Sequence, residues 1–244
     1  MMEQIIEAHG GAVRGNALVA IEAEISIRGF LFTAKRVPVL NHVRVRACTR
    51  EPRFTFFDFP RPGHNSEFMG EEEVRITNGD GKVVARCLQP RAGFRSLRRQ
   101  FSWDHLDFTY FAGYATWNYL LFPFLFLHDG FQFKVMESLP GASGCGSRLR
   151  VTFPDGIPTH CREQIFYFDE QWCLRRLDYT AEVVGRWARA TMLCGDYRDF
   201  DGFQAPTRRR VLPRLFGNKP LSGPTLVALD IHHIRPLREE RRNT

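Results

Sequence analysis

One histidine and two arginines that could recognise an anionic ligand fall on two consecutive predicted strands, 160–168 and 172–183. If residues 169–171 form a three-residue hairpin loop, the register pairs polar positions across the strands: Gln164 with Arg176, Arg162 with Asp178, and His160 with Thr180. One face would then carry a titratable imidazole and two guanidiniums, as in an apolar pocket with a few convergent polar groups. Because Arg, Gln and Asp are mostly exposed in proteins, the same face could instead be a solvated outer surface.

The other candidate site residues lie in an uncharged segment, 108–127, in which nine of the twenty residues are aromatic. Helical spacing places four of its large side chains on one face: Tyr110, Tyr114, Trp117 and Leu121. Such a stripe is typical either of a protein core or of a ligand cavity. A buried Asn118 would need partners from the backbone, water or a ligand. We therefore expect a ligand-sized cavity beside Trp117 and Asn118.

The sequence contains no motif for a metal site or for covalent catalysis. His160 and Glu163 would point to opposite faces of a strand, and so would the adjacent His232 and His233, so neither pair can share a metal ion. No GxSxG, P-loop or GxGxxG motif occurs. We predict no metal and no cofactor, and the catalytic residues of an enzyme stay unknown beyond His160 or Tyr114 as an acid or base.

Alternating apolar and charged residues predict β-strands along most of the chain. In residues 18–28 the apolar side chains that share one face are Ile21, Ala23, Ile25 and Ile27. Glu22 and Glu24 lie on the opposite face, and we expect them to face Arg44 and Arg46 on a paired neighbouring strand. About eleven such strands, with few helices between them, predict an antiparallel meander.

Two helices are predicted among these strands. Residues 2–9 have a short amphipathic pattern that ends at two glycines. In the segment 103–128, Asp104 is a candidate N-cap and Pro123 should end or kink the helix. Twenty uncharged residues would be long enough to span a membrane, but Tyr, Thr, Asn, Gly and Pro interrupt them and no second span follows. A helix buried within the protein is the favoured interpretation.

The composition of the chain limits how many domains it can form and which classes of partner it can bind. A chain of 244 residues that is 43% hydrophobic can form one domain, and its 22 Phe must fill a large interior or line a cavity. The net charge of +7 is spread along the strands without a nucleic-acid motif, so nucleic acid is not an expected partner. Arginine clusters at 95–99, 208–210 and 238–242 could meet an anionic ligand or an anionic membrane surface, although a run of charges is more often solvated. The first residues, MMEQIIEAHGG, lack the basic and apolar regions of a secretory signal, so we expect a cytoplasmic protein.

Three stretches carry a resemblance to a known family: the opening helix EQIIEAHGG with the strand ALVAIEAEISI, the hairpin REQIFYFDEQWCLRRLDYTAEVV, and the last strand LVALDIHHIR. In this order they resemble the LolA/LolB-like lipoprotein-carrier superfamily, or an uncharacterised bacterial family of the same build. The resemblance implies a strongly curved antiparallel sheet around an apolar cavity that helices close. The insert WDHLDFTYFAGYATWNYLLFPFLF is longer than the helices of the carriers.

Together these patterns predict a mainly β protein with one domain, 1–244. Its curved antiparallel sheet forms an incomplete barrel of about eleven strands, with an N-terminal helix and a central buried aromatic helix. The predicted function is binding of an apolar or amphiphilic small molecule in the enclosed cavity. Two alternatives stay open: an enzyme of the cyclase, isomerase or hydratase type that uses the same cavity, and a peripheral membrane or protein-interaction module.

Overall fold

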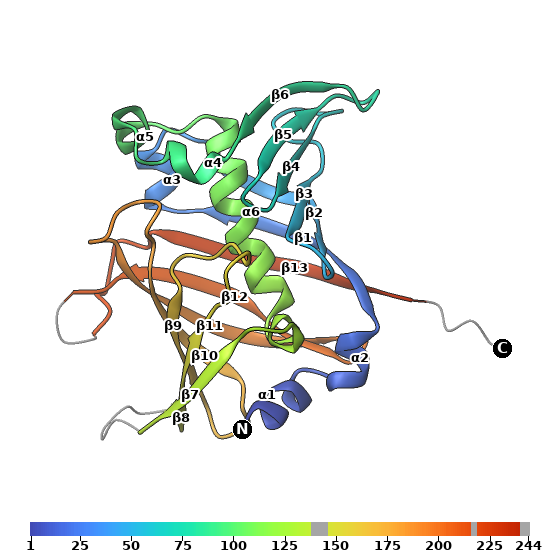
Figure 1. Ribbon diagram of the computed structural model, residues 1–244, viewed down its shortest axis with the longest axis vertical. Helices are drawn as coiled ribbons and strands as arrows, with labels where there is room; N and C mark the ends of the chain where they lie inside the picture. The colour runs from blue at the N-terminus through green and yellow to red at the C-terminus, as the bar shows by residue number, and fades with distance from the viewer. Residues whose placement is uncertain (138–145, 216–218, 240–244) are drawn as a thin grey trace.

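A computed structural model describes residues 1–137, 146–215 and 219–239, and in this part of the chain all strands belong to one antiparallel sheet (Figure 1). The sheet is 13-stranded, with the order β6-β5-β4-β3-β2-β1-β13-β12-β11-β10-β9-β8-β7. It is open, because β6 and β7 form its two edges. The strands are β1 Leu18–Arg28, β2 Leu40–Cys48, β3 Arg53–Phe56, β4 Asn65–Met69, β5 Glu73–Thr77, β6 Val83–Leu88, β7 Gln132–Met136, β8 Ser147–Thr152, β9 Glu163–Phe168, β10 Leu174–Thr180, β11 Arg189–Phe200, β12 Phe203–Pro213 and β13 Val227–Arg238.

The helices are short except for one. They are α1 Met2–Ala8, α2 Ala12–Asn16, α3 Phe30–Ala34, α4 Pro90–Gly93, α5 Leu97–Phe101, α6 His105–Leu121 and the 3-10 helix η1 Phe124–Leu127. Within the described residues, none of them has both the length and the apolar character that crossing a membrane requires.

The chain order explains why α6 crosses a face of the sheet. Strands β1–β6 and β7–β13 are two meanders, which pair with each other only through β1 and β13. The chain leaves the first meander at one edge of the sheet, β6, and enters the second at the opposite edge, β7. Residues between these strands must therefore span the sheet, and Figure 1 shows α6 running between the two meanders. The predicted aromatic insert is this connection.

The sequence prediction for α6 is confirmed. Asp104 accepts a hydrogen bond from the backbone N–H of Asp107, and the Asp107 carboxylate accepts one from the N–H of Asp104, which completes a capping box. The helix ends at Leu121, two residues before Pro123, which cannot donate a backbone hydrogen bond. Nearly all of its side chains are buried.

The register predicted for the first two strands is also confirmed. Glu22 lies opposite Arg46 and Glu24 opposite Arg44 on β2. Glu22 forms ion pairs with Arg46, at 2.5 Å, and with Arg235 of β13. The partner of Glu24 is His42 and not Arg44. The count of about eleven strands was too low, partly because the short polar strand β4 has no clear apolar alternation.

The predicted register of the hairpin between β9 and β10 is wrong. Leu174 lies opposite Phe168, and Asp178 lies opposite Ile165 rather than Arg162. The turn is longer than three residues: the backbone N–H of Asp169 donates to the carbonyl of Cys173, and Trp172 has φ 62°. A bulge between Leu174 and Arg176 then shifts the remaining pairs.

Two further pairs of that prediction change with the register. Arg176 lies opposite Tyr167 and not Gln164. His160 precedes β9, which begins at Glu163, and so is not a strand residue opposite Thr180.

The two halves of the sheet are covered differently. The backbone of α6 packs closely on β2–β6, and at Gly113 an added Cβ would lie 2.7 Å from the Cβ of Phe68 on β4. Over the other half, large side chains fill the space instead. Phe122 stacks on Phe166 of β9 at 5.7 Å, and Phe126 meets the same ring edge-on at 5.3 Å.

Candidate functional site

A buried histidine is surrounded by tyrosines where α6 faces the second meander. Nδ1 of His160 is hydrogen-bonded with the hydroxyl of Tyr114 at 3.0 Å, and Nε2 with that of Tyr119 at 2.7 Å. The ring of Tyr179 on β10 stacks on the imidazole at 4.0 Å. Burial, helped by the positive charge of Arg91, lowers the pKa of His160 to about 3. The ring is therefore neutral, and one tyrosine donates to it while the other accepts from it.

This arrangement limits the chemistry of His160. Both ring nitrogens are engaged, so the imidazole has no free position at which to take a proton from a substrate. Burial also raises the pKa of the Tyr114 hydroxyl well above its usual value. The enzyme hypothesis requires an acid or base whose pKa lies near neutral pH. The surroundings of His160 and Tyr114 give neither residue such a pKa.

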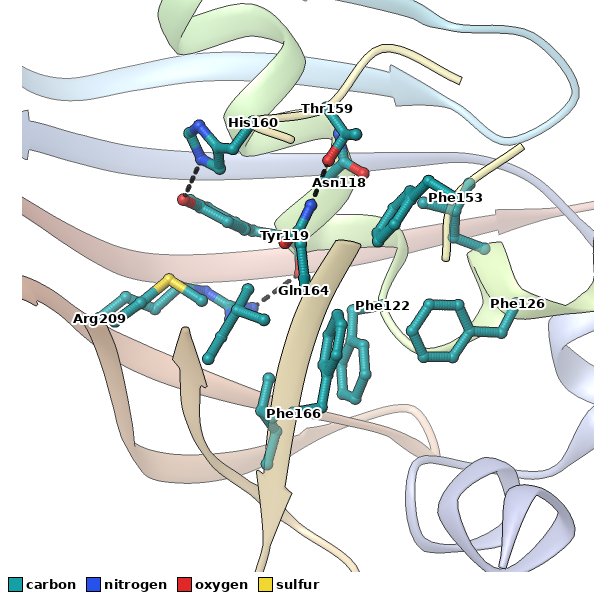
Figure 2. Close-up of a pocket in the computed structure, with 14 residues that line it drawn as sticks. Asn118, Tyr119, Phe122, Phe126, Phe153, Thr159, His160, Gln164, Phe166 and Arg209 are labelled. Carbon is teal, nitrogen blue, oxygen red and sulfur yellow. Dashed lines mark hydrogen bonds between the residues drawn. The ribbon is translucent and has the colours of Figure 1, made fainter. Parts of the chain in front are cut away.

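Below His160 lies an internal cavity of about 20 Å³, enough for about one water molecule (Figure 2). Its polar residues gather on one side and the phenylalanines on the other. The residues of its wall are Asn118, Tyr119, Phe122, Leu125, Phe126, Phe153, Thr159, His160, Gln164, Phe166, Leu174, Leu177, Met192 and Arg209. A second cavity, also of about 20 Å³, lies on the far side of Tyr119 and His160.

A larger outer pocket adjoins the first cavity. It has a volume of about 310 Å³ and lies beside α2 and the end of α6. Leu121, Phe124 and Leu127 contribute to its wall. Leu125 borders both this pocket and the internal cavity, so η1 separates the two spaces.

The cavity contains a buried positive charge. Arg209 of β12 is 2% exposed, and its Nη2 donates to the carbonyl of Tyr119 at 2.7 Å. The guanidinium lies 5.4 Å from the centre of the Tyr119 ring. Among the residues that the structure describes, its Nε has no hydrogen-bond partner, and neither has Oδ1 of Asn118 in the same cavity wall.

No protein-family model matches the chain, and no curated protein sequence does. Solved structures match over nearly its whole length. A LolA superfamily protein from Nitrosomonas europaea has a TM-score of 0.53 at 12% identity, covering 98% of this chain and 94% of that one. A putative outer membrane lipoprotein-sorting protein domain from Vibrio parahaemolyticus has a TM-score of 0.53 at 10% identity, covering 99% and 94%. This chain has a LolA-like fold.

A DUF1329 family protein from Desulfovibrio piger also matches, with a TM-score of 0.50 at 13% identity over 96% of this chain and 91% of that one. The fold resemblance inferred from the order of elements is confirmed by these matches. At such identities the likeness concerns the fold alone and names neither a site nor a ligand.

Within the LolA-like fold, the predicted site residues separate into groups. Asn118 and His160 line the internal cavity, and Leu121 lines the outer pocket. Tyr114 reaches the site through its bond with His160. Two others are packed elsewhere along α6: Tyr110 against Phe68 and Phe94, and Trp117 with its Nε1 donating to the carbonyl of Cys48 at 2.8 Å.

The two predicted arginines lie outside the cavity wall. Arg162 is exposed and pairs with Asp155 at 3.1 Å. Arg176 pairs with Asp178 at 2.8 Å, on the opposite face of β10 from Leu177 and Tyr179. Neither arginine lines the internal cavity, so an anion-recognising role for them there stays a prediction without support from the cavity wall.

Sequence reasoning named Arg209 only as part of the cluster 208–210 and not as a cavity residue, and it missed Tyr119 and Tyr179. The signal for Arg209 was present: in the run Arg208–Arg210, strand alternation must turn the middle residue to the face opposite its neighbours. The structure bears this out, since Arg208 pairs with Asp196 and Arg210 with Asp230 on the outer face. The clustering of Tyr119 and Tyr179 on His160 had no local signal.

Proposed function

We propose that this protein binds one apolar or amphiphilic small molecule between α6–η1 and the half of the sheet formed by β8–β12. The observation that carries the proposal is the internal cavity, whose wall is mostly aromatic and aliphatic with a few converging polar groups. This is the composition of sites for apolar ligands. The LolA-like fold supports the same location, since its sheet presents an apolar face to a crossing helix.

The ligand needs more space than the closed cavity offers. A volume of about 20 Å³ holds only water, whereas small-molecule sites span roughly 300–1,000 Å³. Displacement of η1 with Phe122 and Phe126 would join the cavity to the outer pocket of about 310 Å³, because Leu125 borders both. A 3-10 helix has poorer hydrogen-bond geometry than an α-helix, so we assign the movement to η1.

A surface groove of about 1050 Å³ is the larger hollow, but its wall is charged. Six of its side chains carry charge: Glu71, Glu72, Arg91, Arg95, Glu182 and Arg186. Apolar ligands favour concave sites with mainly apolar walls. The groove is therefore a less suitable site for such a molecule than the space under η1.

Enlarging Met192 on β11 tests this location. Met192 is 1% exposed and faces the cavity, so we expect Met192→Phe to fill it and to weaken binding of a neutral naphthyl probe by at least about tenfold. The matched control is Leu193→Phe, because the neighbouring side chain points to the other face and is 38% exposed. Fluorescence titration of both variants, below their unfolding temperatures, measures the effect. Equal affinities in the wild type and both variants would place the site elsewhere.

A further inference from the structure

Arg209 differs from the other arginines of its strand in having no carboxylate partner within the described part of the chain. Among the described residues its hydrogen bonds are to the carbonyl of Tyr119 at 2.7 Å and to the thiol of Cys194 at 3.8 Å. Arg208 and Arg210 each pair with an aspartate. Arginine stays charged in proteins, so the fold buries a positive charge that these contacts compensate only in part.

The nearby charged groups do not neutralise it. Burial, together with the Arg209 charge, lowers the pKa of His9 to about 4, so His9 is neutral near pH 7. The charge of Asp169 acts to raise the pKa of His9, but the Asp169 carboxylate is bound by Arg175 at 2.6 Å. An uncompensated buried charge is costly to keep, and such a group usually has a partner.

The position of Arg209 shows where that partner would come from. The side chain lines the internal cavity, and its buried Nε–H has no acceptor in the described ranges 1–137, 146–215 and 219–239. Phe122, Phe126 and Phe166 line the other side of the same space (Figure 2). A cavity with one cationic end and an aromatic remainder matches a molecule with one anionic head and one apolar tail.

We infer that Arg209 receives the carboxylate of a long-chain carboxylic acid, whose tail takes the space of Phe122 and Phe126. This inference rests on the proposed function and adds the ligand class. A guanidinium offers parallel N–H donors that fit the two oxygens of a carboxylate, and charge-assisted hydrogen bonds are the strong ones. An alcohol of equal chain length supplies the tail without the charge.

The test compares palmitic acid with hexadecanol as competitors of the neutral naphthyl probe, at pH 8 where the acid is ionised. In the wild type we expect the acid to bind at least about tenfold more tightly than the alcohol. Arg209→Met should remove this preference while the alcohol still binds, and Arg209→Lys should keep part of it. Arg208→Met, on the exposed outer face, is the matched control and should keep it fully.

The outcomes separate the two proposals. Equal affinity of acid and alcohol in the wild type, or an acid preference that survives in Arg209→Met, would overturn the role of Arg209 while leaving the apolar site intact. The wild-type comparison needs no variant to fold, and circular dichroism checks each variant. If acid, alcohol and naphthyl probe all fail to bind, the proposed function fails, and the inference with it.

Discussion

Between pH 8 and pH 5 the protein is expected to lose about 4 kcal/mol of its free energy of unfolding, because His9 and His160 are buried in neutral form. Burial lowers their pKa values from 6.5 to about 4 and about 3. Each histidine takes up a proton in the unfolded chain at a higher pH than in the folded protein. The stability that they contribute is thus complete above pH 6.5 and is lost as the pH falls below that value, at about 2 kcal/mol per histidine by pH 5.

Carboxylates should contribute little to the change in the free energy of unfolding between pH 8 and pH 5. The pKa of Glu22 is lowered: its partial burial acts to raise it, but the hydrogen bonds and charges of Arg46 and Arg235 outweigh that effect. The stability from such a group is present above its unfolded pKa of 4.5 and is lost only below it. A pH between 5 and 8 therefore isolates the histidines.

Urea denaturation at pH 8 and pH 5 measures the loss. His160→Gln, which can still donate and accept hydrogen bonds, should reduce the pH-dependent part by about half, whatever it does to stability at pH 8. His233→Gln is the control, because His233 is exposed. The same free energy of unfolding at pH 8 and pH 5 in the wild type would show that the two histidines are not buried in neutral form.

Replacing Asp178 with alanine should destabilise the fold by about 3–5 kcal/mol. Its carboxylate is buried and binds Arg176 at 2.8 Å, the hydroxyl of Tyr167 at 3.0 Å and that of Thr191 at 2.6 Å. Arg214 lies 3.7 Å away. Alanine would remove this carboxylate from two largely buried guanidiniums, and the loss of one member of a buried ion pair is costly.

The matched control is Asp155→Ala. Asp155 forms an ion pair with Arg162 in which both side chains are exposed, and such pairs contribute at most about 1 kcal/mol. Chemical denaturation at pH 7 compares the two variants with the wild type. A cost for Asp178→Ala no greater than that for Asp155→Ala would contradict the buried network described here.

The sequence was sufficient to predict the elements whose signals are local. The alternation of charged and apolar residues from Glu22 to Ile25 was enough to predict which face of β1 is buried and how β1 pairs with β2. The uncharged segment, with Asp104 before it and Pro123 near its end, determined α6. Each of these signals lies within a few residues, where the side-chain period and backbone chemistry act directly.

The features that the sequence did not reveal depend on backbone geometry or on distant packing. The hairpin register failed because Trp172 adopts a positive φ and a bulge follows Leu174, neither of which the residue types demand. The role of Arg209 depends on what covers β12, and alternation gives the face of a residue but not the depth at which it lies. The sequence therefore singled out Arg162 and Arg176, which pair with Asp155 and Asp178 outside the cavity wall.

Native mass spectrometry of the protein purified under non-denaturing conditions from its own host tests ligand binding most directly. We expect a population whose excess mass equals one small amphiphile, which is released on unfolding and is reduced in the Met192→Phe variant. A protein that carries no such mass, and that gains none after incubation with a long-chain acid or alcohol, would contradict a ligand site between α6–η1 and the sheet.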